Sequence, residues 1–99
     1  MAKGGYVYIM SNKNRTVLYI GVTSNLFNRV NEHKDGIGSI FTSKYNCVDL
    51  IYFKFYETIE EAIQREKKMK KWNRSWKDKL LKEFNPNLVD LTQTVSEMQ

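Results

Sequence analysis

The chain has 99 residues, of which 41% are hydrophobic and 13% aromatic, and its net charge is +5. A chain of this length builds one modest core, so we expect one domain over residues 1–91 and a disordered polar tail over 92–99. It has no apolar run of about 18 residues, no secretory leader pattern and a single cysteine, Cys47, so we expect a cytoplasmic protein without membrane span or internal disulfide.

Two runs rich in β-forming residues, 6–10 and 17–22, flank the polar segment "SNKNRT" and predict an antiparallel hairpin. We expect its turn to be centred between Lys13 and Asn14. The expected partners are then Val7 with Ile20, Tyr8 with Tyr19, and Ile9 with Leu18. Because opposite residues point the same way, this register places the aliphatic side chains on one face and both tyrosines on the other.

A helix is predicted next, with Thr23 or Ser24 as its N-cap and Gly36 as its C-terminal stop. Arg29 and His33 are four residues apart, so they share one face of this helix. An ordinary exposed polar face would give the same pattern.

The connection that follows, residues 37–47, is longer than packing requires, and long loops often carry binding residues. Lys44 and Tyr45 could meet a phosphate or stack on a base. Alternatively, Phe41 and Tyr45 only hold the loop against the core.

Residues 49–57 predict a third strand, because their side chains alternate in character. Ile51, Phe53 and Phe55 are expected on one side, and Tyr52, Lys54 and Tyr56 on the other. A capping box of Thr58 and Glu61 begins a helix over about 59–73, and a short helix over 75–84 ends at "NPN". The predicted fold class is therefore α/β of the α+β type, a three-stranded antiparallel sheet flanked by helices in the order β-β-α-β-α-α.

The positive charge is concentrated in residues 65–79, which hold eight basic residues and two acidic ones. Such a cluster gains free energy by releasing counterions from phosphates, so nucleic acid is the expected partner. A membrane surface and a merely solvated helix face are the alternatives. The candidate nucleic-acid contacts are Lys44, Lys67, Lys68, Lys70, Lys71 and Arg74.

Glu66 falls inside the apolar sector of a helical wheel that holds Ile59, Ala62, Ile63, Met69 and Trp76. A carboxylate on an inner face needs a cation, a metal or hydrogen-bond donors. An ion pair with Arg29 or Lys70, or escape to the surface at the helix edge, would satisfy it. The alternative is a metal site, since one carboxylate with waters and a phosphate can hold Mg²⁺.

These residues resemble the GIY-YIG nucleases. The paired motif reads "YVY" at 6–8 and "YIG" at 19–21, with Tyr6 and Val7 in place of the usual glycine and isoleucine. Arg29, His33 and Glu66 follow at the family spacing. The resemblance covers about residues 5–80 and is strongest to the small bacterial members that consist of this domain alone.

The resemblance implies a divalent-metal-dependent endonuclease that hydrolyses phosphodiester bonds in DNA repair, recombination or processing. It makes Tyr8 or Tyr19 the general base, or the relay to it, once a nearby cation lowers the tyrosine pKa. It has Arg29 contact the scissile phosphate, His33 assist, and Glu66 hold one ion, Mg²⁺ or Mn²⁺. A late asparagine often joins the family's site, and Asn73 and Asn85 are both candidates.

DNA is the expected partner, although the sequence does not distinguish it from RNA. Larger family members carry a separate DNA-binding domain, so here affinity is expected from the basic segment, an oligomer or a partner protein. Two other functions fit the same residues: a nucleic-acid-binding module with little turnover, and an interaction domain for a protein. The five site positions favour the nuclease, because phosphate binding alone needs no carboxylate.

Overall fold

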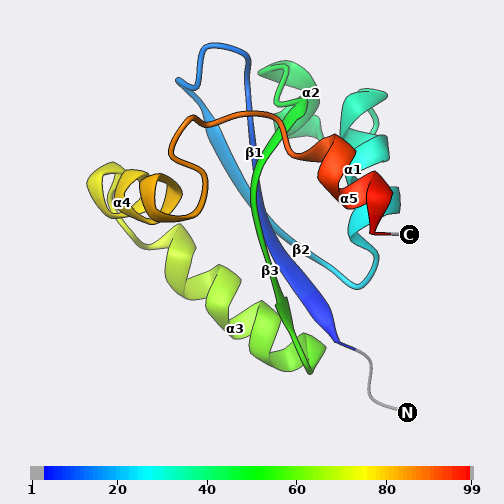
Figure 1. The fold of residues 1–99 in the computed structure, drawn as a ribbon, viewed down its shortest axis with the longest axis vertical. Helices are drawn as coiled ribbons and strands as arrows, with labels where there is room; N and C mark the ends of the chain where they lie inside the picture. Colours follow the sequence, from blue (N-terminus) through cyan, green and yellow to red (C-terminus); the bar gives the residue numbers. More distant parts are fainter. Residues whose placement is uncertain (1–3, 99) are drawn as a thin grey trace.

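The computed structural model describes residues 4–98, which form a three-stranded antiparallel sheet flanked by helices. The elements are β1 (Gly5–Ser11), β2 (Leu18–Thr23), α1 (Leu26–Lys34), α2 (Ile40–Lys44), β3 (Asp49–Tyr56), α3 (Ile59–Lys70), α4 (Arg74–Phe84) and α5 (Thr92–Glu97). The strand order is β2-β1-β3, so the first strand of the chain lies in the centre of the sheet. The predicted α+β class and order of strands and main helices are confirmed, and α2 and α5 are additions (Figure 1).

The hairpin register differs from the expected one by two residues. Ile9 lies opposite Ile20, and Tyr8 lies opposite Gly21 rather than Tyr19. The turn is displaced because the side chain of Asn12 accepts hydrogen bonds from the backbone N–H groups of Thr16 and Val17, at 2.9 and 3.0 Å. A shift of two keeps every side chain on its predicted face, so both tyrosines still share one side.

A β-bulge interrupts the pairing of β1 with β3. Ile9 pairs with Tyr52 and Met10 with Leu50, so Ile51 is the extra residue. The predicted alternation in this strand is therefore wrong at Ile51, which joins the same core cluster as Tyr52, whereas Phe53 packs on the opposite side.

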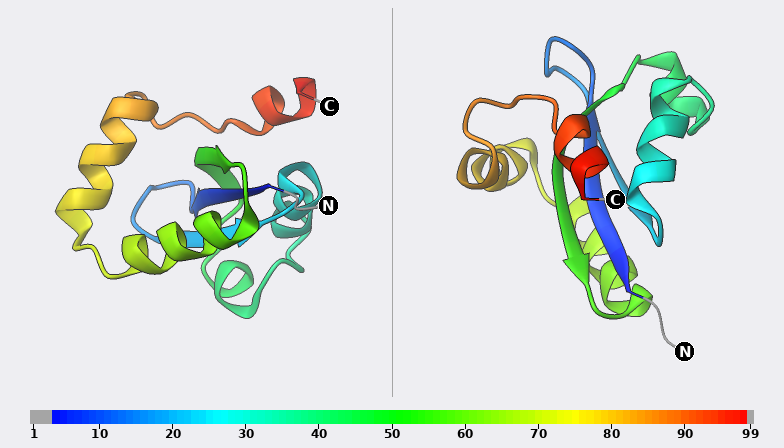
Figure 2. Two further views of the ribbon diagram at one scale, coloured as in Figure 1. Left: turned by 90° about the horizontal axis from the view of Figure 1, so that it is seen from below. Right: turned by 45° about the vertical axis from the view of Figure 1, so that its right-hand side comes forward.

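The two faces of the sheet are covered by different helices. The first face is aliphatic and packs against α3 and α4; its buried residues include Val7, Ile9, Ile20, Ala62, Met69 and Leu81. The second face carries Tyr8 and Met10 and packs against α1 and α5, through residues such as Val30 and Val95. Figure 2 shows the sheet between these two layers, with α4 turning steeply away from α3.

The ends of the helices follow local side-chain bonds. The N-cap of α1 is Asn25, not Thr23 or Ser24, since the hydroxyl of Thr23 accepts a bond from the N–H of Asn25 instead. The capping box of Thr58 and Glu61 is confirmed, and α1 ends two residues before Gly36. The third helix ends at Lys70 rather than about residue 73, because Asn73 caps the next helix.

The expected disordered tail over 92–99 is wrong for its described part. Thr92–Glu97 form α5, and Val95 is buried on the Tyr8 face of the sheet. Leu91 N donates to the carbonyl of Leu50 at 2.7 Å, which fixes the chain just before this helix. One apolar side chain in a polar segment is enough to dock it. None of the helices within residues 4–98 has the length and apolar character needed to cross a membrane.

Candidate active site

Three predicted site residues meet in one hydrogen-bonded group between β1 and α1. The hydroxyl of Tyr8 lies 2.8 Å from Nε2 of His33, and Nε of Arg29 donates to the same hydroxyl at 3.3 Å. Tyr8 and His33 are each only 1% exposed. The expectation that Arg29 and His33 are neighbours on one helix face is confirmed, and that face is turned toward the sheet.

Burial decides the protonation of this group. It raises the pKa of Tyr8 to about 12, and the hydrogen bond from Arg29 offsets only part of this rise. Burial and the nearby Arg29 charge together lower the pKa of His33 to about 4. Both residues are therefore neutral at pH 7. The expected lowering of the tyrosine pKa by a cation is outweighed at Tyr8, because desolvation is the larger effect.

The proton positions on Tyr8 and His33 can be assigned from their partners, because the guanidinium of Arg29 can only donate. Since Arg29 donates to the Tyr8 oxygen, the hydroxyl is free to donate to Nε2 of His33. In the arrangement that pairs every donor, neutral His33 carries its proton on Nδ1, 3.0 Å from the hydroxyl of Thr42. Thr42 in turn donates to the backbone carbonyl of Ser39 at 3.3 Å. Each polar side chain in this hydrogen-bonded series, which runs from Arg29 through Tyr8, His33 and Thr42 to the Ser39 carbonyl, therefore has a partner.

Sequence reasoning missed Thr42, and it missed why two glycines flank the site. A Cβ atom at Gly38 would overlap the imidazole of His33, and one at Gly21 would overlap the hydroxyl of Tyr8. The glycine of "YIG" therefore leaves room for the tyrosine on the neighbouring strand. A signal for Thr42 was present, since a buried histidine needs a second partner and "SIFT" holds the nearest hydroxyls in the chain.

Tyr19 lies beside this group and links it to α3. Its ring centroid is 6.4 Å from that of Tyr8 and 5.5 Å from that of His33. Phe41 packs 5.9 Å away, and Nζ of Lys70 lies 6.0 Å from the Tyr19 ring centroid. These side chains border an open groove of about 280 Å³, lined by Leu18, Tyr19, Ile20, Phe41, Lys70 and Lys77.

Glu66 lies at the same edge of the molecule, on the helix that carries Lys70. Its carboxylate is 3.2 Å from Nζ of Lys70, and its side chain is only 14% exposed. Of the open alternatives, the pair with Lys70 is present, whereas Arg29 bonds Glu32 at 2.8 Å. The structure thus brings Tyr8, Tyr19, Arg29 and His33 into contact, and Lys70 connects Glu66 to Tyr19.

The single carboxylate of Glu66 suits a divalent cation that prefers oxygen ligands and keeps most of its bound waters. No group of three or more His, Cys, Asp or Glu side chains capable of holding a metal occurs between residues 4 and 98. Mg²⁺ does not need such a group, since it commonly binds one or two carboxylates together with waters and substrate phosphate. The carboxylate of Glu66 becomes available to such an ion once Lys70, whose side chain is 51% exposed, turns to solvent.

Four of the six candidate nucleic-acid contacts, at the end of α3 and the start of α4, differ in their partners. Lys67, Lys68 and Lys71 are exposed at the end of α3, free to meet phosphates. Arg74, by contrast, bonds Asp78 and the backbone carbonyls of Arg15 and Thr16, so it fixes α4 to the hairpin turn.

Lys44 is exposed on α2, with Nζ 5.3 Å from the ring centroid of Tyr45. Tyr45 packs against Phe41 with ring centroids 4.8 Å apart, and Phe41 packs against Tyr19, so these aromatic rings hold the segment against the sheet; a phosphate or base contact of Lys44 and Tyr45 stays a prediction. Of the two asparagine candidates, Asn73 caps α4 and Asn85 bonds the backbone of Ile51 and Val89, so both have structural partners away from Tyr8.

Comparison with known proteins agrees with this geometry. A family model described as the GIY-YIG catalytic domain matches residues 4–79. The chain is 41% identical over 76 residues to a UPF0213 protein of Clostridium perfringens, covering 77% of this chain and 81% of the relative. It is 36% identical over 91 residues to a UPF0213 protein of Pediococcus pentosaceus, covering 92% and 95% of the two chains.

A UPF0213 protein of Natronomonas pharaonis is 36% identical over 81 residues, covering 82% of this chain and 94% of the relative. The names of these relatives state a family and no activity. No solved structure matches the chain. The family model and the relatives show that the chain belongs to the GIY-YIG family, a superfamily of nucleases.

Proposed function

We propose that this chain is a divalent-metal-dependent endonuclease that hydrolyses phosphodiester bonds in DNA during repair, recombination or processing. The observation that carries the proposal is the hydrogen-bonded group of Arg29, Tyr8 and His33 between β1 and α1. The group joins a hydroxyl, an imidazole and a guanidinium, which can transfer a proton and bind a phosphate.

Hydrolysis needs an acceptor for the proton of the attacking water. Tyr8 would take that proton on its oxygen while its own proton passes to Nε2 of His33 along the 2.8 Å hydrogen bond. The proton then rests on His33 and Tyr8 ends as it began; because burial and Arg29 hold the pKa of His33 at about 4 in the free protein, this step needs the negative charge of the bound phosphate beside Arg29. Because the two groups exchange a proton rather than build up a free phenolate, the high pKa of Tyr8 does not forbid this step.

The negative charge that develops on the phosphate needs a cation. Arg29 would supply it by exchanging its bond to Glu32, which is 47% exposed and well solvated, for a bond to a phosphate oxygen. Glu66 would hold the divalent ion, Mg²⁺ or Mn²⁺, which when bound would stabilise charge on the leaving 3′ oxygen. The lysines at the end of α3 would hold the nucleic-acid backbone beside this edge.

A second function, nucleic-acid binding with little turnover, has one observation in its favour. Lys70 is paired with the carboxylate of Glu66 and would compete with a metal ion for it, and neutral His33 has no extra proton to give to the leaving group. In that case the site would bind phosphate without cutting it.

The experiment that separates these functions replaces Glu66 by alanine. Purified protein is incubated with labelled duplex, single-stranded, flap and branched DNA and with RNA, in Mg²⁺ or Mn²⁺. For a nuclease, Glu66→Ala abolishes cleavage and leaves DNA binding intact or tighter, because a negative charge near the phosphate is removed. Glu60→Ala, an exposed change on the same helix, is the matched control and should cut normally.

Thermal melting without metal checks the structural alternative. The Glu66–Lys70 pair joins residues i and i+4 and one partner is half exposed, so its loss should cost no more than about 0.5 kcal/mol. If Glu66→Ala melts far below the wild type, or if it cuts at the wild-type rate, Glu66 is structural and the metal role is wrong. If no substrate is cut under any condition, the binding function replaces the nuclease.

A further inference from the structure

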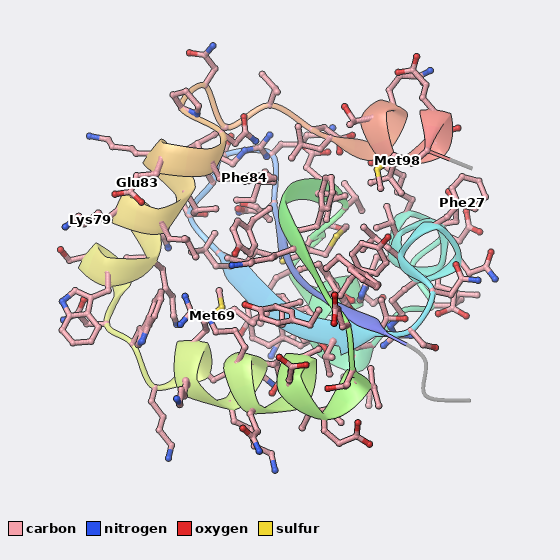
Figure 3. All side chains as sticks on the ribbon, turned by 60° about the horizontal axis from the view of Figure 1, so that its bottom comes forward. Phe27, Met69, Lys79, Glu83, Phe84 and Met98 are labelled. Atoms are coloured by element: carbon pink, nitrogen blue, oxygen red, sulfur yellow. The ribbon has the colours of Figure 1, made fainter. Side chains whose placement is uncertain are left out.

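A second cleft lies between α3 and α4, away from the tyrosine group. It has a volume of about 390 Å³ and is lined by Arg65, Trp72, Trp76, Lys79, Leu80 and Glu83. Lys79 extends from α4 on the side away from the sheet (Figure 3). The volume is within the range of about 300–1,000 Å³ usual for small-ligand sites.

The aromatic wall of this cleft is left open to solvent. Trp76 is 59% exposed, so its predicted place among the core residues of the helical wheel is wrong. The wheel assumed one continuous helix, whereas α3 ends at Lys70 and α4 begins at Arg74 with a different orientation of its faces. Trp72 lies edge-on to it, with ring centroids 6.1 Å apart and planes at 76°. An exposed indole presents a flat apolar face on which a planar ligand can stack.

The cleft also contains a cation, Arg65, that forms no direct ion pair within the described residues. The guanidinium of Arg65 stacks on Trp72 at 4.8 Å, and Nε of Arg65 is buried without a hydrogen-bond partner in the described part of the chain. Lys79 adds a second positive charge against the single carboxylate of Glu83.

The charge of the surroundings identifies the ligand. Arg65 and the exposed Lys68 are three residues apart on α3, so they are neighbours on the helix surface, whereas Lys67 lies on the opposite side and Lys71 follows the end of the helix. A polyanion drawn to Arg65, Lys68 and Lys79 reaches an indole ring on which a planar group can stack. Single-stranded nucleic acid offers both features, because its bases are not covered by pairing. A protein partner would be expected to bring apolar side chains, and Leu80 is the only aliphatic residue in the cleft.

We infer that this cleft binds an unpaired base of single-stranded nucleic acid, with the base stacked on Trp76 and the flanking phosphates held by Arg65 and Lys79. The inference rests on the proposed function, since it gives the nuclease a preference for substrates with an unpaired segment. It needs no turnover, however, and is tested by binding alone.

The two tryptophans of the chain both line the cleft, so their fluorescence reports on it directly. Wild-type protein is titrated, without divalent ions, with single-stranded oligothymidylate of about ten nucleotides, within the usual site size. Duplex DNA of equal length and inorganic polyphosphate are the comparison ligands. We expect saturable quenching by the single strand and much weaker quenching by the other two, since stacking needs an uncovered base.

Variants of Trp76 separate stacking from simple apolar contact. Trp76→Leu should bind the single strand about 5- to 100-fold more weakly than wild type, whereas Trp76→Phe should keep most of the affinity. Phe55→Ala removes another exposed aromatic side chain, 53% exposed and outside the cleft, and should bind normally. Affinities of all variants are measured by anisotropy of a labelled oligothymidylate.

Equal quenching by polyphosphate and oligothymidylate, or wild-type affinity of Trp76→Leu, would overturn the inference. So would quenching by none of the three ligands, which would leave the cleft to a protein partner. If the wild-type protein cuts no substrate but its tryptophan fluorescence is still quenched by the single strand, the nuclease proposal fails and this binding site stands. The two failures are therefore distinguishable.

Discussion

On β1, successive side chains alternate between two very different environments. Val7 and Ile9 point into an aliphatic cluster beneath α3, whereas Tyr8, between them, points toward α1 and bonds Arg29 and His33. Both environments are buried, since all three strand residues are at most 1% exposed. The same strand thus contributes to a conventional core on one face and to a polar site on the other.

The difference lies in how each face tolerates change. On the aliphatic face, stability comes from burial and packing, which depend on volume rather than on direction. On the tyrosine face, buried polar groups are stable only while every donor and acceptor is paired, as in the chain Arg29, Tyr8, His33, Thr42 and Ser39. Loss of one hydroxyl there disturbs its neighbours, whereas loss of one methyl on the other face leaves a small void.

The largest expected contrast is between Tyr8→Phe and Ile9→Val. Tyr8→Phe keeps the ring and removes the hydroxyl, so we expect cleavage to fall about 10²- to 10⁴-fold with a loss of about 1–2 kcal/mol in stability. Ile9→Val should lower the free energy of unfolding by a comparable amount, about 0.5–1.5 kcal/mol, and leave cleavage unchanged. Urea denaturation and single-turnover cleavage are measured on both variants.

Tyr19→Phe extends this test to the second tyrosine, which forms only ring contacts with its described neighbours. If Tyr8→Phe cuts normally and Tyr19→Phe does not, the base is Tyr19 and the buried bond to His33 is structural. If both variants cut normally, both tyrosines are core residues, and the two faces differ only in polarity.

Much of this division was predictable, because it depends on the period of two residues along a strand. The tyrosines were placed on one face even though the register was displaced by two, since an even shift preserves the faces. The bulge at Ile51 was not predictable, because it depends on pairing with a distant strand. Thr42 was missed although "SIFT" offered hydroxyls for a buried histidine, because its partner His33 is on another helix and the sequence does not show which hydroxyl reaches it.

The next largest effect concerns the outer surface of α3, the helix that covers the aliphatic face. Replacing Lys67, Lys68 and Lys71 by alanine should weaken DNA binding for all sequences alike, since phosphate contacts carry no base information. The slope of log affinity against log salt should fall by about 2.7, which corresponds to about 40-fold between 50 and 200 mM salt. Filter binding or anisotropy over this salt range gives the slope.

The matched control removes equal charge elsewhere, by replacing Lys13, Lys54 and Lys82 with alanine. Its salt slope should stay near that of wild type. Equal slopes for the two triple variants would mean that net charge alone drives binding, and that the layer over the aliphatic face has no specific part in function.

A smaller effect is expected from acid, and it should act only on the tyrosine face. The pKa of His33 is about 4 in the folded protein against 6.5 in a free histidine, because of burial and the Arg29 charge, which the nearby Glu32 only partly offsets. Between these two values the unfolded chain binds a proton that the folded chain does not, so stability falls as pH falls and levels off below about 4. The loss should be about 2 kcal/mol between pH 7 and pH 5.

Urea denaturation at a series of pH values measures this slope. His33 is the only histidine in the chain, so His33→Gln should be less stable at pH 7 but nearly independent of pH between 7 and 5. A wild-type protein with constant stability over this range would show that the imidazole is solvated and that the tyrosine face is open rather than closed.

The smallest expected effect tests the hydrogen-bonded series on the tyrosine face most directly. Thr42→Val keeps the shape of the side chain and removes the oxygen that accepts the Nδ1 proton of His33 at 3.0 Å. The imidazole should then shift its proton to Nε2, where it can no longer accept from Tyr8, so kcat should fall about 3- to 10-fold with KM unchanged. Nitrogen-15 NMR of the imidazole distinguishes the two tautomers directly, in the absence of substrate, and Thr42→Ser should restore both the tautomer and kcat.

Thr42 acts here as a positioning residue, through His33 rather than on the phosphate. A Thr42→Val protein whose imidazole still carries its proton on Nδ1, or whose kcat is lost without any change of tautomer, would show that Thr42 only packs α2 against α1, and the hydrogen-bonded series would then end at His33.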